Sequence, residues 1–366
     1  MINISLKNKK IIKDFIFLNL VWIFAFYFFD FIQLSNFKEG NEVALDPLLQ
    51  QIQGFNRFFS SIALGTLFSF INLYVQRNAD RLRTKSYGYI IVTYSIVHIV
   101  LVFAAISLVA SLSVFVFSGS LQRENLAGLI KFFQSKDLIR ILIYTFLISI
   151  SIFVVKLINE KLGKGVLWNL ILGKYRQPKE DRLLFLFMDL KSSTTYAELL
   201  GHRKYSELIQ DCFSDLTPAV SACHAKIYQY VGDEAVLSWK YADGIKQANC
   251  IRVFFHFKSI LKTRSQYYLD TYGFVPEFKA GINGGRIMVA EVGYLKRSIA
   301  YHGDAINTAA RIQGQCNSFE RDILLSEKIV NDVQKTNQVN FIELEDIQLK
   351  GKKEKVKLFS IDQFKI

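Results

Sequence analysis

Cysteine and proline are scarce in this chain, with four of each among 366 residues. The cysteines are far apart and none has C-x-x-C spacing, so the sequence offers neither a zinc ribbon nor a disulfide framework. The low proline content, together with only 20 glycines, excludes collagen-like and low-complexity material. Apolar residues make up 51% of the chain, which excludes intrinsic disorder. Reduced thiols in a cytosolic domain are the simplest interpretation of the cysteines.

The net charge of +13 indicates either a nucleic-acid partner or an anionic membrane surface. The distribution of apolar residues decides between them. Four long apolar runs, 15–34, 58–75, 88–117 and 138–158, lie in the first part of the chain. Each reaches the roughly 18–20 residues that a helix needs to cross a bilayer. Bulky side chains, Phe28, Phe29, Phe31 and Ile32, occupy the place where a signal peptidase would need small ones, so we expect a retained helix.

Basic residues alternate between the segments that join these runs. The N-terminal tail, the second loop and the segment after the last run are the richer ones, and they contain Lys7, Lys9, Lys10 and Lys13; Arg77, Arg81, Arg83 and Lys85; and Lys156, Lys161, Lys164, Lys174 and Arg176. The positive-inside rule then predicts four spans in the inner cell membrane, with both termini cytoplasmic. The basic excess is explained by topology, and we expect a lipid bilayer and no nucleic acid as partner. Asp30, His98 and Arg140 are the ionisable residues in or beside the spans, and His98 is a candidate for a sensing site.

The chain divides into three predicted parts: a four-helix transmembrane domain over 1–158, a juxtamembrane transmitting linker over 159–182 and a soluble domain over 183–366. In the soluble part we expect a buried strand ending at Asp189, helices, and a hairpin that turns at Gly232-Asp233. One long helix over about 245–268 follows, then two strands that turn at Gly284-Gly285. The β-α-β-β-α-β order, with strands added at the end, predicts a ferredoxin-like α+β fold with helices on one face.

This fold places Asp189 and Asp233 at adjacent strand ends. Two carboxylates in such a position are typical ligands of Mg²⁺ or Mn²⁺. The amides of Ser193 and Thr194 begin the next helix, where anionic phosphates bind well. Either aspartate alone is commonly structural, but the combination indicates metal-dependent phosphoryl chemistry.

A second group of polar residues follows Gly303. Asn307 and Arg311 are four residues apart and share one face of a predicted helix. The planar guanidinium suits a phosphoryl group that gains charge during a reaction. Lys350 lies in a basic run and is a further phosphate-binding candidate. An exposed polar helix face and a solvated lysine are the alternatives for these residues.

The soluble part resembles the class III nucleotidyl cyclases, through FMDLKSST, KIYQYVGDEAVLSW, FKAGINGG, YHGDAINTAAR and LKGKKEKVKLF, in that order. The resemblance implies an adenylate cyclase in which Asp189 and Asp233, with the Leu190 carbonyl, bind two divalent cations. It also implies that Asn307 orients the ribose, that Arg311 stabilises the transition state and that Lys350 holds the terminal phosphate. The family builds its site from two catalytic domains, so a homodimer is expected.

The positions that read the base depart from this family. Gln229 and Ala300 stand where adenylate-specific members usually carry a lysine and an aspartate or threonine. Because a glutamine amide can both donate and accept hydrogen bonds, it fits adenine or guanine. ATP is the expected substrate, and GTP is the alternative.

Other functions remain as alternatives. A catalytically silent cyclase-like signalling module would keep the fold, although all the metal and transition-state side chains are present. A diguanylate cyclase is disfavoured because the chain has VGDEA instead of a GGDEF-type motif. A transporter or channel is disfavoured because the predicted spans contain few charged residues.

Overall fold

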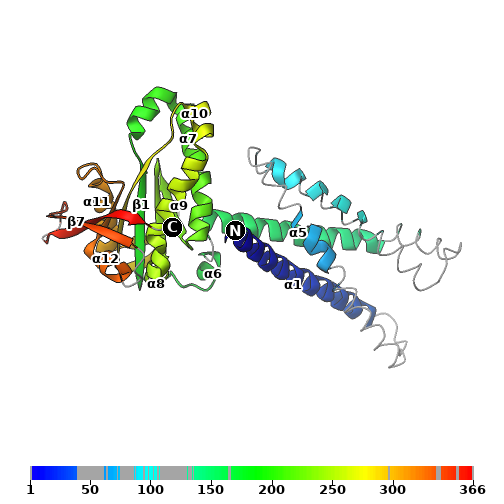
Figure 1. Cartoon of the computed structure of the whole chain (residues 1–366). Coiled ribbons are helices and arrows are strands. Elements are labelled where there is room, and N and C mark those ends of the chain that lie inside the picture. The colour runs from blue at the N-terminus through cyan, green and yellow to red at the C-terminus, as the bar shows by residue number, and fades with distance from the viewer. Residues whose placement is uncertain are drawn as a thin grey trace. The chain divides into compact units, whose positions relative to one another are not determined.

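The computed structural model describes residues 2–38, 136–163, 166–295, 297–334, 339–351 and 354–364, with scattered positions between 62 and 134. The chain forms two compact units, which divide between Ile158 and Asn159. Unit 1 is helical, and unit 2 contains a β-sheet with helices (Figure 1).

Unit 1 contains two long apolar helices, α1 (Ile2–Lys38) and α5 (Lys136–Leu162). The segments Ile12–Phe29 and Leu138–Asn159 are long and apolar enough to cross a membrane. The two helices are in contact through aromatic side chains, since the rings of Phe29 in α1 and Tyr144 in α5 have centroids 4.8 Å apart. The Tyr144 hydroxyl donates a hydrogen bond of 2.7 Å to the Ala25 carbonyl and ties α5 to α1.

These two helices coincide with the first and the fourth predicted spans. Most of the second and third predicted spans, as well as His98 and the side chain of Asp30, lie outside the described residues. Arg140 lies in the first turns of α5 and is exposed. The shorter apolar helix Gly88–Leu101 falls within the third predicted span.

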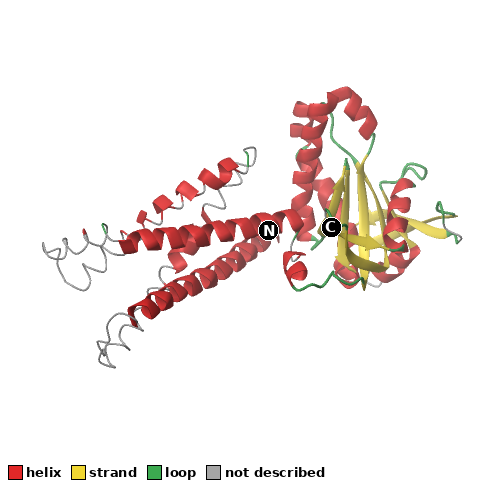
Figure 2. Ribbon diagram, turned by 180° about the vertical axis from the view of Figure 1, so that it is seen from behind, coloured by secondary structure: helices red, strands yellow, loops and turns green. Residues whose placement is uncertain are grey.

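Unit 2 is built around an 8-stranded sheet with the order β2-β3-β1-β4-β6-β8-β7, and β5 pairs with β4 beside this path (Figure 2). The strands are β1 (Lys179–Leu190), β2 (Lys226–Val231), β3 (Glu234–Lys240), β4 (Phe278–Val292), β5 (Ser298–His302), β6 (Ile323–Ser326), β7 (Val339–Ile347) and β8 (Val356–Phe364). The first four strands in this order are antiparallel neighbours, as the predicted ferredoxin-like core requires.

Helices cover both faces of this sheet. The α-helices in the described part of unit 2 are α6 (Val166–Ile171), α7 (Ser193–Ala222), α8 (Tyr241–Ile245), α9 (Asn249–Thr263), α10 (Ser265–Tyr272), α11 (Asp304–Gly314) and α12 (Glu327–Gln334). Alternate side chains of β1 point to opposite faces: Leu184 and Leu186 pack with α7 and α9, whereas Phe185 and Phe187 pack with α11. Figure 1 shows α7 and α11 on opposite sides of β1. The expectation of helices on one face was therefore wrong for α11.

The predicted turn at Gly284-Gly285 was also wrong, because β4 runs straight through both residues. Gly284 pairs with Leu184 of β1, and Gly285 pairs with Leu183. A Cβ on Gly284 would lie 2.8 Å from the Tyr241 ring, and one on Gly285 would lie 3.1 Å from the Cβ of Ala305. The two glycines therefore serve close packing on both faces of the strand.

The long helix predicted over 245–268 is interrupted. Gln247 and Ala248 have positive φ angles of 52° and 50°, which separate α8 from α9. The Asn249 side chain donates a 2.9 Å hydrogen bond to the Asp243 carbonyl and stabilises this break. Ser192, predicted as a capping residue, takes the N-cap position of α7 in a left-handed conformation without a capping hydrogen bond from its side chain.

The contact between β4 and α11 yields a stability prediction. A Cβ on Gly281 would lie 2.2 Å from the Gln313 backbone nitrogen, so Gly281→Ala forces α11 away from the sheet. We expect this variant to lose about 3 kcal/mol of unfolding free energy, or roughly 6–12 °C in melting temperature. Gly314→Ala, which meets nothing within 4 Å, is the matched control and should unfold like the wild type. Equal melting temperatures of the two variants in thermal unfolding would contradict this close contact.

Candidate active site

Asp189 and Asp233 meet at one end of the central strands. Asp189 is the penultimate residue of β1, and its register partners are Glu234 of β3 and Lys279 of β4. Asp233 follows Gly232 in the turn of the β2–β3 hairpin. Gly232 has a φ angle of 61°, a left-handed backbone conformation that favours glycine. The structure therefore brings together the two carboxylates that the sequence places at adjacent strand ends.

Their carboxylate oxygens differ in their partners. Asp189 Oδ2 accepts a 3.2 Å hydrogen bond from Gln313 Nε2 of α11 and lies 3.4 Å from Lys279 Nζ. Asp233 Oδ2 is buried and has no hydrogen-bond partner among the described residues. An anionic oxygen in this state has lost its hydration without compensation, which is unfavourable unless a cation binds.

The pKa values of the neighbouring carboxyl groups indicate the same excess of negative charge. Burial raises the pKa of Asp189, the charge of Asp233 raises it further, and Lys279 and Gln313 oppose the shift. Burial, with the charges of Asp189 and Asp233, raises the pKa of Glu234 to about 7. A bound cation would relieve both shifts because it favours the ionised forms.

This arrangement fits a hard divalent cation. No group of three or more His, Cys, Asp or Glu side chains able to hold a metal ion occurs in the described part of the chain. Mg²⁺ commonly binds one or two carboxylates together with water and substrate phosphates, so a pair is sufficient. The orphan oxygen of Asp233 and the adjacent Asp189 supply such a pair, and Leu190 is buried at the end of β1, next to Asp189 in the chain.

The start of α7 lies at the same end of the sheet. Burial raises the pKa of Tyr205 in this helix; Asp233 and Asp189 raise it further, and a hydrogen bond with the Ser193 side chain opposes them. The Ser193 hydroxyl is thus close to the carboxylates. Thr194, in the same first turn, is exposed.

Asn307 and Arg311 lie on one face of α11, as their spacing predicts. Asn307 is exposed and Arg311 is half-buried. A guanidinium nitrogen of Arg311 lies 3.4 Å from where a Cβ on Gly351 would be, so it packs against the loop that contains the exposed Lys350. Arg311 and the Lys350 loop are therefore neighbours. No hydrogen bond or ion pair among the described residues joins Asn307 or Arg311 to the two aspartates.

The two predicted base-reading residues lie beside residues that contact each other. Tyr228 of β2 stacks on Tyr301 of β5 with ring centroids 4.4 Å apart. Gln229, next to Tyr228, is exposed at a β-bulge, and Ala300, next to Tyr301, is half-buried. The strands that contain Gln229 and Ala300 are thus close in space.

Sequence reasoning missed three residues of this site: Lys279, Gln313 and Glu234. Lys279 and Glu234 are the residues paired with Asp189 in β4 and β3. Both lie inside quoted motifs, FKAGINGG and VGDEA, so a register drawn through these motifs would have found them. Gln313 gives no such signal, because it depends on how closely α11 packs on Gly281.

A comparison with known proteins finds a family that matches most of unit 2. Residues 175–363 match the family described as Adenylate and Guanylate cyclase catalytic domain. Adenylate cyclase 2 of Rhizobium meliloti (strain 1021) is 32% identical over 223 residues, which cover 61% of this chain and 61% of that protein. An adenylate cyclase of Anabaena cylindrica is 22% identical over 185 residues, 49% of this chain and 36% of that protein. The matches thus cover well under two thirds of these curated relatives.

Among solved structures, a bacterial light-regulated adenylyl cyclase is similar with a TM-score of 0.52 and 20% identity. The match covers 60% of this chain and 64% of that one. At this identity the similarity concerns the fold, and it agrees with the arrangement of strands in unit 2.

The raised pKa of Glu234 predicts proton release when a divalent cation binds. A cation beside Asp189 and Asp233 favours ionised Glu234 and lowers its pKa from about 7. At pH 7 about half a proton per chain should then be released, and more at pH 6. Titration calorimetry with Mn²⁺ in buffers of different ionisation enthalpy measures this number. Glu234→Gln should remove the release, whereas Glu345→Gln, an exposed control in β7, should preserve it. Release that persists in Glu234→Gln would assign the proton to another group.

Proposed function

This chain belongs to the adenylate and guanylate cyclase catalytic-domain family, and on that premise we propose that it converts ATP to 3′,5′-cyclic AMP and pyrophosphate. The observation that carries the proposal is the buried, unpartnered oxygen of Asp233 beside Asp189. Such a pair suits a reaction in which a highly charged triphosphate binds together with cations.

Asp189, Asp233 and the Leu190 carbonyl hold two divalent cations, Mg²⁺ or Mn²⁺, in this proposal. When bound, the cations acidify the ribose 3′-hydroxyl and offset the charge of the triphosphate. Lys350 and the first turn of α7, with Ser193 and Thr194, bind phosphate oxygens.

The α11 residues act on the nucleotide in the same reaction. Asn307 orients the ribose so that its 3′-oxygen faces the α-phosphate. Arg311 donates hydrogen bonds to the phosphoryl oxygens as they gain charge, and its position against the Lys350 loop places two cationic side chains near one another. Both roles follow the family motif at these positions.

The site is proposed to form between two copies of this chain. Within the described residues of one chain, no hydrogen bond or ion pair joins Asn307 or Arg311 to Asp189 or Asp233, which supports a composite site. In a two-fold homodimer, one protomer supplies the carboxylates and its partner supplies Asn307 and Arg311. Two equivalent sites result.

ATP is the proposed substrate because both curated relatives are named adenylate cyclases. Gln229 and Ala300 are the proposed base-reading residues. The absence of a lysine at 229 favours one alternative, a guanylate cyclase, because the glutamine amide can also meet the guanine edge.

The membrane arrangement is part of the proposal. Unit 1 is proposed to cross the inner cell membrane four times, with both termini and unit 2 in the cytoplasm. Its two described long helices expose large apolar side chains, such as Phe17, Phe24, Ile143 and Leu147, which are 55–70% exposed and suit contact with lipid. The alternation of basic residues between the segments sets the orientation.

Asp233→Asn tests the metal assignment and the activity together. A neutral amide is a poor ligand for a hard cation, so we expect cyclase activity with Mn²⁺ to fall more than about 100-fold, equivalent to several kcal/mol. Purified wild-type protein is assayed with ATP and with GTP, and the cyclic product is identified by mass. Asp243→Asn, an exposed control in α8, should retain full activity. Wild-type turnover by Asp233→Asn would refute the metal site, and cyclic GMP as the main product would reverse the substrate.

Mixed dimers test whether the site is shared. Co-expressed Asp233→Asn and Arg311→Ala chains form one complete site in each heterodimer, while the opposite site contains both changes. With random pairing about half of the dimers are mixed, so activity should return to about a quarter of the wild-type value. Differential tags confirm that heterodimers form. Inactive heterodimers would show that each site is built within one chain.

A further inference from the structure

A cavity of about 370 Å³ opens where β4 lacks a strand neighbour on one side. On that side β6 pairs with Ala280–Ile282 and β5 pairs with Met288–Val292. In the described part of the chain no strand fills the gap between these pairings. Gly303 closes one end of the gap, because a Cβ there would lie 3.2 Å from the Arg286 carbonyl. We call this cavity, at residues 283–286 of β4, the edge pocket.

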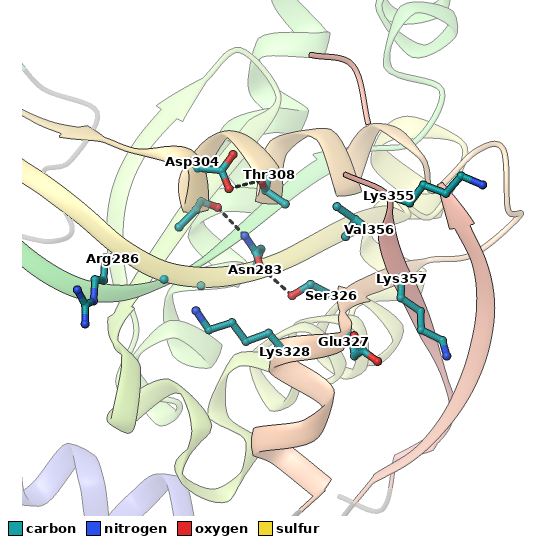
Figure 3. Close-up of a pocket in the computed structure, with 13 residues that line it drawn as sticks. Asn283, Arg286, Asp304, Thr308, Ser326, Glu327, Lys328, Lys355, Val356 and Lys357 are labelled. Atoms are coloured by element: carbon teal, nitrogen blue, oxygen red, sulfur yellow. Dashed lines mark hydrogen bonds between the residues drawn. The ribbon is translucent and has the colours of Figure 1, made fainter. Parts of the chain in front are cut away.

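The edge pocket is lined by more positive than negative side chains. Its ionisable residues are the cations Arg286, Lys328, Lys355 and Lys357 and the carboxylates Asp304 and Glu327. Three of these groups already have partners: Lys357 pairs with Glu343 at 2.5 Å, Arg286 pairs with Glu180 at 3.6 Å, and Asp304 accepts a 3.4 Å hydrogen bond from Thr308. Figure 3 shows the Lys328 side chain directed toward β4 between Asn283 and Arg286, whereas Lys355 and Lys357 point outward at the opposite rim.

Lys328 is the central cation of the edge pocket. Its ammonium lies 5.6 Å from the centroid of the Tyr241 ring and makes no hydrogen bond or ion pair with the residues that the structure describes. The missing side chain of Gly285 leaves room for it, since a Cβ there would lie 3.5 Å from Lys328 Nζ. Partial burial lowers the pKa of Lys328, Arg182 and Arg286 lower it further, and Asp332 opposes them. A neighbouring negative charge would reverse this shift.

The floor of the edge pocket is polar and already satisfied. Asn283 donates a 3.0 Å hydrogen bond to the Ala305 carbonyl and accepts one of 2.7 Å from the Ser326 hydroxyl. These side chains are neutral and are already hydrogen-bonded to each other or to the backbone. The charge that a ligand would neutralise is therefore that of the cations.

We propose that the edge pocket binds a soluble anion that contains a phosphate group. A phosphate carries close to two negative charges at neutral pH, and its oxygens accept charge-assisted hydrogen bonds from lysine. It is small enough for a gap one strand wide. The cavity also borders α11 at Asp304 and Thr308. Arg311 lies seven residues after Asp304, about 10 Å further along the helix axis. Because none of the residues that line the cavity is a proposed catalytic residue, the proposal does not depend on the cyclase reaction.

Inorganic phosphate is the probe that tests this site. It is titrated by calorimetry into the full-length protein in phosphatidylcholine nanodiscs, without divalent cations, so that no metal assists binding elsewhere. Lys328→Gln should weaken phosphate binding at least about tenfold. Lys262→Gln, an exposed lysine of α9 on another surface, is the matched control and should bind like the wild type.

Arg311→Ala separates the edge pocket from the proposed phosphate contacts of the catalytic site. We expect this variant to retain wild-type phosphate affinity and Lys328→Gln to lose it, with equal melting temperatures for all variants. The proposal is overturned if Lys328→Gln binds phosphate like the wild type. It is also overturned if Arg311→Ala removes the binding and Lys328→Gln does not, because the phosphate would then occupy the catalytic site.

Discussion

A carboxylate that is buried loses its hydration, and unit 2 buries two of them at adjacent strand ends. Asp189 keeps a hydrogen bond from Gln313 and a nearby Lys279, while Asp233 Oδ2 has no partner in the described structure. The sheet enforces this arrangement, because β1 is paired with β3 and β4 along its length and cannot withdraw its end. Strand pairing in the sheet thus holds the two carboxylates together despite the free energy lost by their desolvation, and a bound cation would offset that loss.

Helix α11 connects the parts of unit 2 that matter for chemistry. Ala305 and Ala309 pack on the sheet, Asn307 and Arg311 face outward, and Gln313 reaches Asp189. This close contact is possible because Gly281 has no side chain. A helix held so tightly has little freedom to tilt, so its polar side chains are presented at fixed positions. The edge pocket borders the start of the same helix, at Asp304, Ala305 and Thr308.

Local sequence signals predicted much of the fold. The Gly232-Asp233 turn, the strand ending at Asp189 and the β-α-β-β-α-β order are confirmed, because each depends on neighbouring residues or on simple periodicity. Gly284-Gly285 misled the prediction, since glycine pairs at turns and glycines required for close packing look alike in a sequence. The break at Gln247 and Ala248 was missed because neither residue type signals a left-handed conformation.

The candidate site was predictable only where motifs carry it. Asp189 and Asp233 could be placed together because two strand ends that are neighbours in the sheet must meet. Lys279 could be placed beside Asp189 only by working out the strand register, and Gln313 could not be placed at all, because its contact depends on the depth at which α11 packs. The same reasoning applies to the edge pocket: its cations come from β4, α12 and the β8 region, which are far apart in the sequence. No short motif encodes such a group, since a gap in strand pairing brings it together. The basic excess along the chain therefore includes, in unit 2, a local concentration of charge that only the fold creates.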